Sequence, residues 1–215
     1  MNHVARTTLV LIMILVNGIA CTPKAREEPV IQDTGSRPLT AKQAFVIAKS
    51  RAQNWQAQAY LAQVIMVIPG NDVESGPRKI VYYFIADHAL GPLRWWDSAF
   101  ITIDAYESKI VGFDESRWAT HPQGPGRFDI ESTTLDSSDA LRMAEDLGGK
   151  VYREKFSNAQ VRIIGTSGII RGELFWEIGY FRPPDVRDDE LSFGIEARTG
   201  EVRGDVYRSS SLSPK

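Results

Sequence analysis

The chain has 215 residues, of which 43% are hydrophobic and 24% charged, and its net charge at pH 7 is -2. This composition is apolar enough to fill a core and excludes a disordered chain. The near-neutral charge supplies no basic face, so no nucleic-acid partner is expected. Cys21 is the only cysteine, which excludes an internal disulfide.

The first 20 residues have the pattern of a signal peptide. Arg6 gives a positive start, Leu9–Val16 is an unbroken apolar run, and small residues lead up to Cys21. The run is too short for a permanent membrane span, which needs about 20 apolar residues. We therefore expect residues 1–20 to be removed on export.

Residues 18–21 resemble the lipobox of bacterial lipoproteins, in which the cysteine is lipidated and becomes the new N-terminus. The pattern departs at Gly18, where an aliphatic residue usually stands, and an ordinary signal peptidase also accepts Gly18 and Ala20. The resemblance implies a bacterial envelope protein held on a membrane by acyl chains, such as palmitate, on Cys21. Thr22 is not an Asp retention signal, which favours the outer membrane in a Gram-negative cell. The alternative is a soluble secreted or periplasmic protein with a free thiol.

Residues 21–37 mix Pro, Gly and charges without periodicity, and we expect a flexible tether there. A ten-residue motif then occurs twice, as Leu39–Ala48 and again as Leu135–Ala144. The two occurrences lie roughly 95 residues apart, which is longer than a solenoid period and typical of paired small domains. We expect one unit over 38–116 and a second over 134–208.

The first unit starts with a helix. Thr40 is a suitable N-cap, and Ala44, Phe45 and Ala48 follow at helical spacing. Runs rich in β-branched and aromatic residues then predict four strands, at Val64–Ile68, Lys79–Ala86, Ala99–Asp104 and Lys109–Phe113. Ser108 stands where the second unit has Gly200, so we expect a looser or longer turn in the last hairpin.

Residues 117–133 are rich in Pro and Gly and predict a linker between the units. In the second unit Asp136 is the N-cap, and Gly148-Gly149 is expected to stop the helix. Four strands are predicted at Ala159–Ile164, Glu173–Phe181, Leu191–Glu196 and Glu201–Tyr207. A disordered tail is expected over 209–215. The predicted fold class is α+β, with two tandem repeats, each a helix packed on an antiparallel sheet of about four strands.

The helix pattern Leu-[Thr/Asp]-x-x-x-Ala-x-x-x-Ala and the ending Ile195–Val202 (IEARTGEV) resemble the PepSY domain. The resemblance covers most of 38–113 and 134–207, and the first unit departs from it at Ser108. It implies small α+β modules of bacterial secreted and membrane-attached proteins, for which inhibition or modulation of peptidases has been proposed. The family offers no catalytic residues.

Catalytic motifs are missing from the sequence. It contains no Gly-x-Ser-x-Gly, no His-Glu-x-x-His and no phosphate-binding glycine loop. His88 and His121 are far apart, and we expect both to be solvated loop residues rather than metal ligands. The chain is therefore predicted to be no enzyme, with no cofactor and no metal.

A binding surface is predicted around Arg94, Trp95 and Trp96, because Trp and Arg are enriched at interface hot spots. Phe181 and Arg182 occupy the equivalent position of the second unit and favour a paired surface. The alternative is that the tryptophan rings complete the core or the joint between units. The predicted function is a non-catalytic envelope lipoprotein that binds or modulates another envelope protein. The alternative function is an envelope protein that holds a lipid or a cell-wall fragment.

Overall fold

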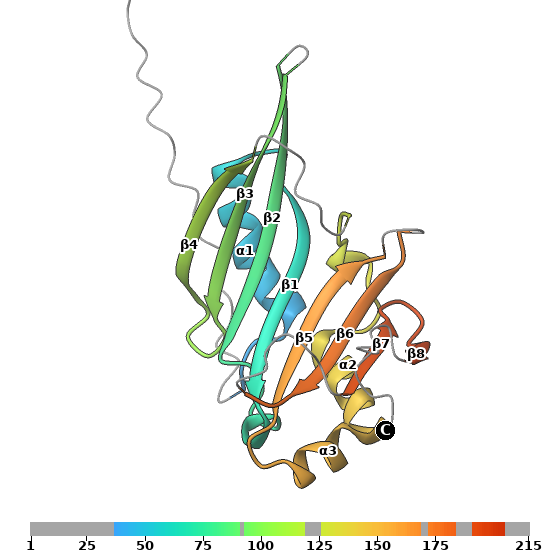
Figure 1. Ribbon diagram of the computed structural model, residues 1–215. Helices are drawn as coiled ribbons and strands as arrows, with labels where there is room; N and C mark the ends of the chain where they lie inside the picture. Colours follow the sequence, from blue (N-terminus) through green and yellow to red (C-terminus); the bar gives the residue numbers. More distant parts are fainter. Residues whose placement is uncertain (1–36, 91–92, 119–125, 169–171, 184–190, 205–215) are drawn as a thin grey trace, which may run out of the picture.

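The chain folds around one antiparallel sheet of eight strands, in the order β4-β3-β2-β1-β5-β6-β7-β8 (Figure 1). The computed structural model describes residues 37–90, 93–118, 126–168, 172–183 and 191–204. The expected signal peptide, Cys21, the tether and the tail lie outside the described residues. The α+β class is confirmed, and the sheets of the two halves are continuous.

The first half contributes one helix and four strands to this architecture. Its elements are α1 (Ala41–Trp55), β1 (Tyr60–Pro69), the 3-10 turn η1 (Gly70–Asp72), β2 (Lys79–Leu90), β3 (Leu93–Asp104) and β4 (Lys109–Trp118). The strands are longer than predicted. The β2–β3 pairing runs from Lys79 opposite Asp104 to Leu90 opposite Leu93, so the polar residues near this hairpin belong to the ladder.

The second half has a more broken helical segment and shorter strands. Its elements are η2 (Ile130–Ser132), α2 (Ser137–Ala144), the π-helical η3 (Glu145–Gly149), α3 (Lys150–Lys155), β5 (Gln160–Ser167), β6 (Leu174–Phe181), β7 (Leu191–Glu196) and β8 (Val202–Gly204). Strand β5 continues three residues beyond Ile164, the predicted end of this strand. Hairpin pairing with β6 extends β5 to Ser167 opposite Leu174.

The two halves are joined by strands β1 and β5, which pair antiparallel at the centre of the sheet. Ile65 lies opposite Ile164, and the ladder runs on to Pro69 opposite Gln160. The remaining strands continue outward by simple hairpins on both sides, so β4 and β8 are the edges. This central pairing makes one sheet out of two groups of four strands.

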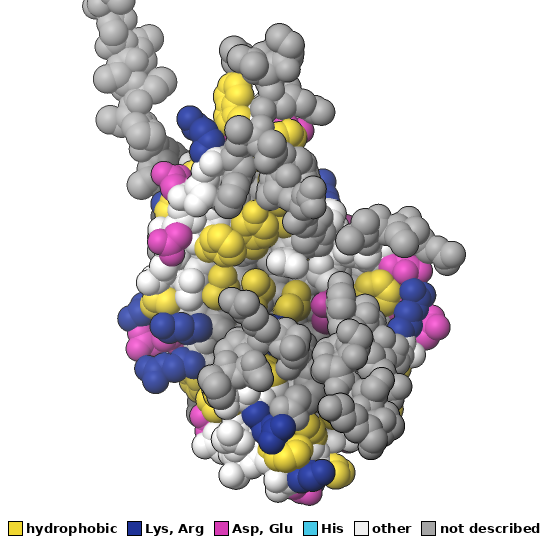
Figure 2. Space-filling model, viewed as in Figure 1, with side chains coloured by type: hydrophobic (Ala, Val, Ile, Leu, Met, Phe, Trp, Pro, Cys, Tyr) yellow, Lys and Arg dark blue, Asp and Glu magenta, His cyan; other side chains and the backbone are white. Residues whose placement is uncertain are grey.

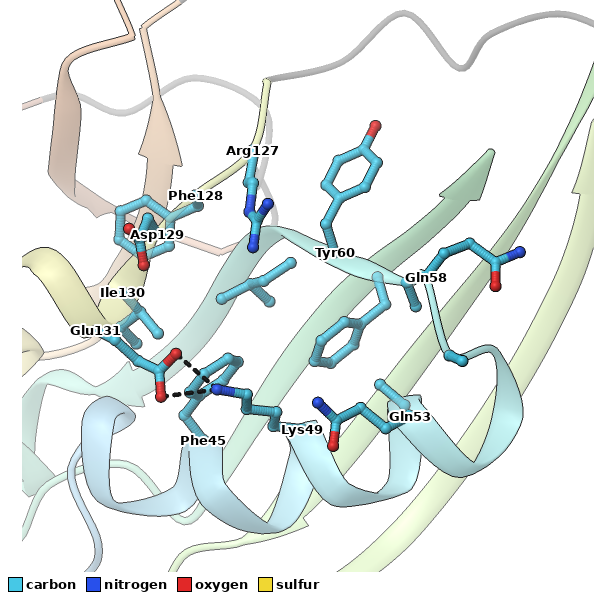
Figure 3. A pocket seen from close by; sticks show the side chains of 15 residues that line it. Phe45, Lys49, Gln53, Gln58, Tyr60, Arg127, Phe128, Asp129, Ile130 and Glu131 are labelled. Carbon is cyan, nitrogen blue, oxygen red and sulfur yellow. Dashed lines mark hydrogen bonds and ion pairs between the residues drawn. The ribbon is translucent and has the colours of Figure 1, made fainter. Parts of the chain in front are cut away.

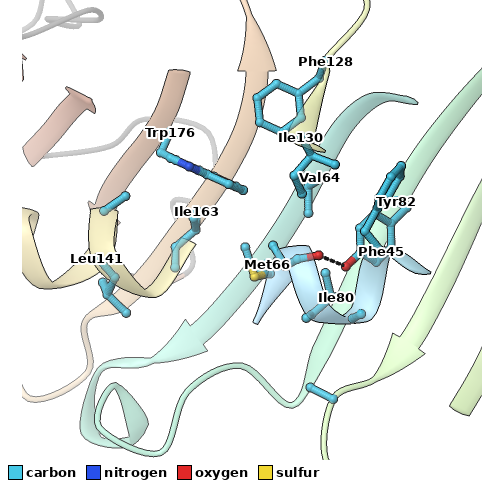
Figure 4. Close-up of a cluster of buried hydrophobic side chains, with 14 of the residues drawn as sticks. Phe45, Val64, Met66, Ile80, Tyr82, Phe128, Ile130, Leu141, Ile163 and Trp176 are labelled. Atoms are coloured by element: carbon cyan, nitrogen blue, oxygen red, sulfur yellow. Dashed lines mark hydrogen bonds between the residues drawn. The ribbon is translucent and has the colours of Figure 1, made fainter. Parts of the chain in front are cut away.

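Both helices α1 and α2 lie on the same face of the sheet, behind it in Figure 1. Small residues let the helices approach closely, since Ala44, Ala48, Ala140 and Ala144 are fully buried. A single apolar cluster fills the space between helices and sheet (Figure 4). The core is therefore continuous across the β1–β5 junction.

Tyr82 anchors the start of α1 to this core. Its hydroxyl donates a 2.6 Å hydrogen bond to the carbonyl oxygen of Ala41. Burial, and then the charge of Asp136, raise the pKa of Tyr82 well above 10. The phenol is thus held neutral as a hydrogen-bond donor.

The first turns of α1 and α2 meet at one carboxylate, that of Asp136. Its Oδ1 accepts the backbone N–H of Ser137 at 2.6 Å, which caps α2. The same side chain accepts the Thr40 hydroxyl at 2.5 Å and the Lys42 N–H at 3.2 Å, both from the start of α1. Each helix leaves its first N–H groups without intrahelical partners. Asp136 therefore links both helices at their N-termini.

Gly148-Gly149 does not end the second helix as expected. The chain passes through the π-helical turn η3, in which Gly148 takes φ 134°, and continues as α3 to Lys155. A β-carbon at Gly148 would be strained at this φ, so glycine here permits a kink. The kink turns α3 toward the sheet, where Gly149 packs against the Tyr180 side chain.

An ion pair holds this kink in place. Arg153 donates to both carboxylate oxygens of Glu145, and its Nη1 donates at 2.6 Å to the Gly70 carbonyl of the first half. The Tyr180 hydroxyl donates to Glu145 at 2.8 Å. Burial, followed by this hydrogen bond to a carboxylate, raises the pKa of Tyr180 above its ordinary value of 10. Arg153 and Glu145 therefore connect the two halves below the sheet junction.

The predicted linker is not a spacer throughout. Phe128 and Ile130 are only 1% exposed, and the Phe128 ring meets the Trp176 ring edge-on at 5.4 Å. The Phe128 N–H donates at 2.8 Å to the Leu61 carbonyl. The Pro and Gly residues of this segment predict a linker, but Phe128 and Ile130 belong to the core.

The two closing hairpins have equal turns, contrary to the expectation of a looser first one. Ser108 adopts φ 53° and Gly200 adopts φ 77°, so both take the left-handed conformation. In the first turn Asp104 accepts the N–H groups of Tyr106 and Glu107, which holds Ser108 in that conformation. The turn therefore forms without glycine, although Ser108 has to adopt a positive φ.

In the second turn the Glu196 carboxylate accepts the backbone N–H groups in the same way, and this makes the stability of the fold depend on pH. Burial alone would raise its pKa, but the N–H groups of Thr199 and Arg198, at 2.6 and 2.9 Å, lower the pKa on balance below its ordinary 4.5. A lowered folded-state pKa contributes stability that is present above the unfolded pKa and is lost as the pH falls through the folded value.

We expect Glu196→Gln to remove this contribution, so that the free energy of unfolding falls less steeply for the variant than for wild type below about pH 4.5. Urea unfolding of both proteins at neutral and acid pH measures the difference. Parallel pH profiles would show that the turn does not bind the ionised carboxylate.

Candidate functional site

The face of the sheet opposite the helices carries a cluster of apolar side chains. Side chains alternate between faces along a strand, and Val64 and Met66 point to the helices, so Ile65 and Val67 point away. The strand register places further apolar residues beside them. We define the outer patch as Ile65, Val67, Val81, Tyr83, Phe100 and Ile164.

The outer patch is open to solvent where it is most apolar. Val67 is 45% exposed and Phe100 38% exposed, and the other four side chains are half-buried. The rings of Tyr83 and Phe100 stack at 4.6 Å with 22° between their planes. Figure 2 views this face, where yellow side chains gather over the middle of the sheet. Neither α1 nor α2 covers them.

This arrangement departs from the usual antiparallel sheet. A sheet with one solvated face normally alternates apolar and polar residues, whereas strands buried on both faces are apolar throughout. The central strand β1 contains the unbroken apolar run Val64–Ile68, and β5 has two adjacent isoleucines, Ile163 and Ile164. Strand β1 therefore has the composition of a strand covered on both faces. Polar side chains appear only around the patch, among them Gln63, Thr102 and Arg162.

The predicted binding residues Arg94, Trp95 and Trp96 lie in β3 rather than in a loop. Trp95 stacks on His88 of β2, with ring centroids 5.6 Å apart. Phe181 ends β6 and is fully buried, whereas Arg182 lies 4.3 Å over the Phe156 ring.

The structure does not bring these two groups together. Trp95 lies opposite His88 near the Tyr60 end of β1, whereas Phe181 lies opposite Gln160 and so beside Pro69 at the other end. Counted along β2, the two positions lie about eleven residues apart, or about 36 Å at roughly 3.3 Å per residue. The two groups therefore lie toward opposite ends of the sheet.

His88 is not a solvated loop residue. Besides stacking on Trp95, its Nε2 lies 3.1 Å from Asp97 Oδ2, outside hydrogen-bond geometry, and its side chain is 19% exposed. Asp97 accepts a 2.8 Å hydrogen bond from Arg117 Nε. These side chains pack together at the end of the β2–β3 hairpin. His121 lies outside the described residues.

A cavity of about 340 Å³ opens on the helix side of the sheet, at the C-terminal end of α1 (Figure 3). Its floor is apolar and consists of buried side chains from α1, β1, β2 and the segment before α2. The Phe45 and Phe84 rings lie 6.3 Å apart and nearly parallel, at 11°. The floor residues are Phe45, Ala52, Leu61, Phe84, Phe128 and Ile130.

The rim of the cavity carries both signs of charge. Lys49 Nζ contacts the two carboxylate oxygens of Glu131 at 2.8 and 2.7 Å, drawn as dashed lines in Figure 3. These side chains are 40% and 62% exposed, so their ion pair contributes little to stability. Arg127 and Asp129 add a second cation and a second anion. The cavity is polar-rimmed and open, not an enclosed apolar chamber.

Among the described residues, no group of three or more His, Cys, Asp and Glu side chains is close enough to hold a metal ion. Of the helices described, none is long and apolar enough to cross a membrane. No family model, curated protein or solved structure matches this chain.

Proposed function

We propose that this chain is a non-catalytic, lipid-anchored protein of a bacterial cell envelope that binds another protein through the outer patch. The observation that carries the proposal is the apolar sheet face that α1 and α2 leave open. Contiguous exposed apolar patches on folded proteins mark interaction sites. Stacked aromatic rings at the centre and polar side chains around them are typical of a protein interface.

The surroundings of the outer patch favour a protein over a membrane surface as its occupant. Membrane-surface elements are rich in Lys and Arg beside their apolar face, which adds attraction to anionic lipids. Here the polar neighbours are mixed rather than basic: Gln63 and Thr102 are neutral, Arg162 lies opposite Val67, and Glu177 lies opposite Ile164. The anchor on Cys21 would keep the protein at the membrane, and residues 22–36 would separate it from the folded part.

We also propose that the two halves of the sheet are copies of one PepSY-like unit. Two equivalent hydrogen bonds support this: the Leu39 N–H donates to Ala105 at 2.8 Å, and the Leu135 N–H donates to Ala197 at 2.9 Å. Each leucine precedes a helix, and each alanine follows a strand. Modulation of a peptidase, as the family resemblance implies, is the first activity to test once a partner is identified.

Two charge-introducing variants test the docking surface. We expect Val67→Glu combined with Phe100→Glu to reduce partner capture from envelope extract by roughly tenfold or more, since buried unpaired charges oppose association. The matched control is Val46→Glu combined with Val151→Glu, which alters exposed positions on the helices.

The control variant should unfold within about 0.5 kcal/mol of wild type, as surface substitutions usually do. The patch variant should lose about 1 kcal/mol more, because Phe100→Glu removes the stack with Tyr83, and both should remain folded. Equal capture by the two double variants would contradict docking on the outer patch. A partner of the same mass as the chain would identify the occupant as a second copy instead.

A further inference from the structure

The position of Ala52, which lines the cavity at the end of α1, is held by a larger residue in the second half. The helical segments of both halves end in the same way. The Gln56 N–H donates to Ala52 at 2.8 Å and the Phe156 N–H donates to Tyr152 at 3.0 Å. Three residues later, the Ala59 N–H donates to the Gln56 carbonyl at 3.0 Å, and the Ala159 N–H donates to the Phe156 carbonyl at 2.9 Å. Ala52 and Tyr152 are therefore equivalent positions.

The strands beneath are equivalent as well. Ile80 lies opposite Ile103, and Trp176 lies opposite Ile195, in the matching hairpins. Phe84 and Tyr180 follow four residues later on β2 and β6. Phe84 forms part of the cavity floor.

In the second half Tyr152 stands at the position equivalent to Ala52, and its side chain is half-buried. It packs against Tyr180 at 6.0 Å and against Phe156 at 4.9 Å between ring centroids. The next residue, Arg153, pairs with Glu145. The longer helical segment, with its kink at Gly148, is what brings Tyr152 there. In the first half the same position is Ala52, which lines the cavity.

We propose that this cavity binds an aromatic amino acid, either free or as one end of a short peptide. The ring would lie against Phe45, Phe84 and Phe128, as Tyr152 lies against Tyr180 in the second half. The rim matches a zwitterion because it offers both signs of charge. The ligand carboxylate would pair with Lys49 and its ammonium with Glu131, replacing an exposed ion pair that contributes little.

The site is distinct from the outer patch. Its floor belongs to the core on the helix side of the sheet, whereas the outer patch lies on the opposite face. The inference does not depend on the proposed protein partner. If no protein binds the outer patch, the ligand proposal is unaffected. If no ligand binds the cavity, the docking proposal is unaffected.

Four probes test the chemistry by calorimetric titration of the wild-type chain. Phenylalanine and the dipeptide phenylalanyl-alanine are both expected to bind. If phenylalanine has the higher affinity, the natural ligand is a free amino acid; if the dipeptide has the higher affinity, it is the end of a peptide. Alanine should not bind, because it lacks the ring. N-acetyl-phenylalaninamide should bind several-fold more weakly, because it lacks both charges. Absence of binding by both phenylalanine probes, or equal binding of alanine, would overturn the proposal.

Cavity-filling variants locate the site. Ala52→Tyr reproduces the second half and should weaken phenylalanine binding by about tenfold or more, because the ring occupies the ligand's place. Ala52→Leu provides a smaller filling if the tyrosine prevents folding. Val46→Tyr, on the exposed side of the same helix, is the control and should bind normally.

Lys49→Met tests the rim separately. It should weaken phenylalanine binding several-fold and leave N-acetyl-phenylalaninamide unaffected. The assignment would be contradicted if both Ala52 variants fold and bind phenylalanine as wild type does. It would also be contradicted if Lys49→Met weakens the binding of phenylalanine and of N-acetyl-phenylalaninamide equally.

Discussion

Replacing Trp176 with alanine should lower the free energy of unfolding by about 4 kcal/mol, the range for a large aromatic side chain lost from a core. Trp176 is fully buried on β6 and packs edge-on against Phe128. Its Nε1 donates a 3.1 Å hydrogen bond to the Leu135 carbonyl, which ties the start of the second helical segment to the sheet. The substitution therefore leaves a cavity and an unpaired carbonyl together. Urea unfolding followed by circular dichroism measures the loss.

The matched control is Trp176→Phe, which keeps a ring and loses the hydrogen bond. We expect this variant to lose about 1–2 kcal/mol. Since small domains have about 5–15 kcal/mol in total, the alanine variant is expected to be marginal. An alanine variant as stable as the phenylalanine variant would mean that the ring does not pack as described.

Asp136→Ala should cost about 3 kcal/mol, more than the loss of an ordinary N-cap, which costs about 1 kcal/mol. One carboxylate here accepts hydrogen bonds from Ser137 in α2 and from Thr40 and Lys42 in α1. Removing it leaves donors at both helix N-termini without a partner, and each unsatisfied buried donor adds to the cost.

The comparison that isolates this double role uses Asp136→Asn and Thr40→Ala. The asparagine retains one acceptor oxygen and should lose about 1 kcal/mol. Thr40→Ala removes only the cap of α1 and one donor to Asp136. Equal losses for Asp136→Ala and Thr40→Ala would refute a shared cap, because each change would then affect a single helix.

The sequence predicts the local elements well, since they depend on local chemistry. Thr40 and Asp136 start the two helices as expected, and each has its capping box. The strand positions follow from β-branched runs such as Val64–Ile68. The kink at Gly148 differs from the expected helix stop, because paired glycines usually end a helix whereas here the chain continues into α3.

The sequence does not predict how distant segments meet. The β1–β5 pairing depends on a register between residues about 100 positions apart, and apolar runs such as Val64–Ile68 fit more than one register. Phe128 was assigned to a linker because its neighbours are Pro and Gly, although it packs on Trp176. The separation of Trp95 from Phe181 also follows from that central pairing.

The candidate sites were missed for the same reason. The outer patch combines strands from both halves, and the cavity combines α1 with residues 127–131. One signal is present in the sequence: Val64–Ile68 of β1 is apolar at consecutive positions, which indicates two covered faces. Only the structure shows that α1 and α2 cover just one of them.

Site-specific photocrosslinking tests the central claim, that the outer patch is a docking surface, most directly. A photoreactive phenylalanine analogue is placed at Val67 or Phe100 on the patch, and at Val46 or Val151 as exposed controls on the helices. The full chain is irradiated in envelope preparations and the adducts are identified by mass. The account predicts one dominant protein adduct at 67 and 100 that is absent at 46 and 151. Equal adducts at all four positions, adducts of the chain with itself alone, or none at the patch would contradict it.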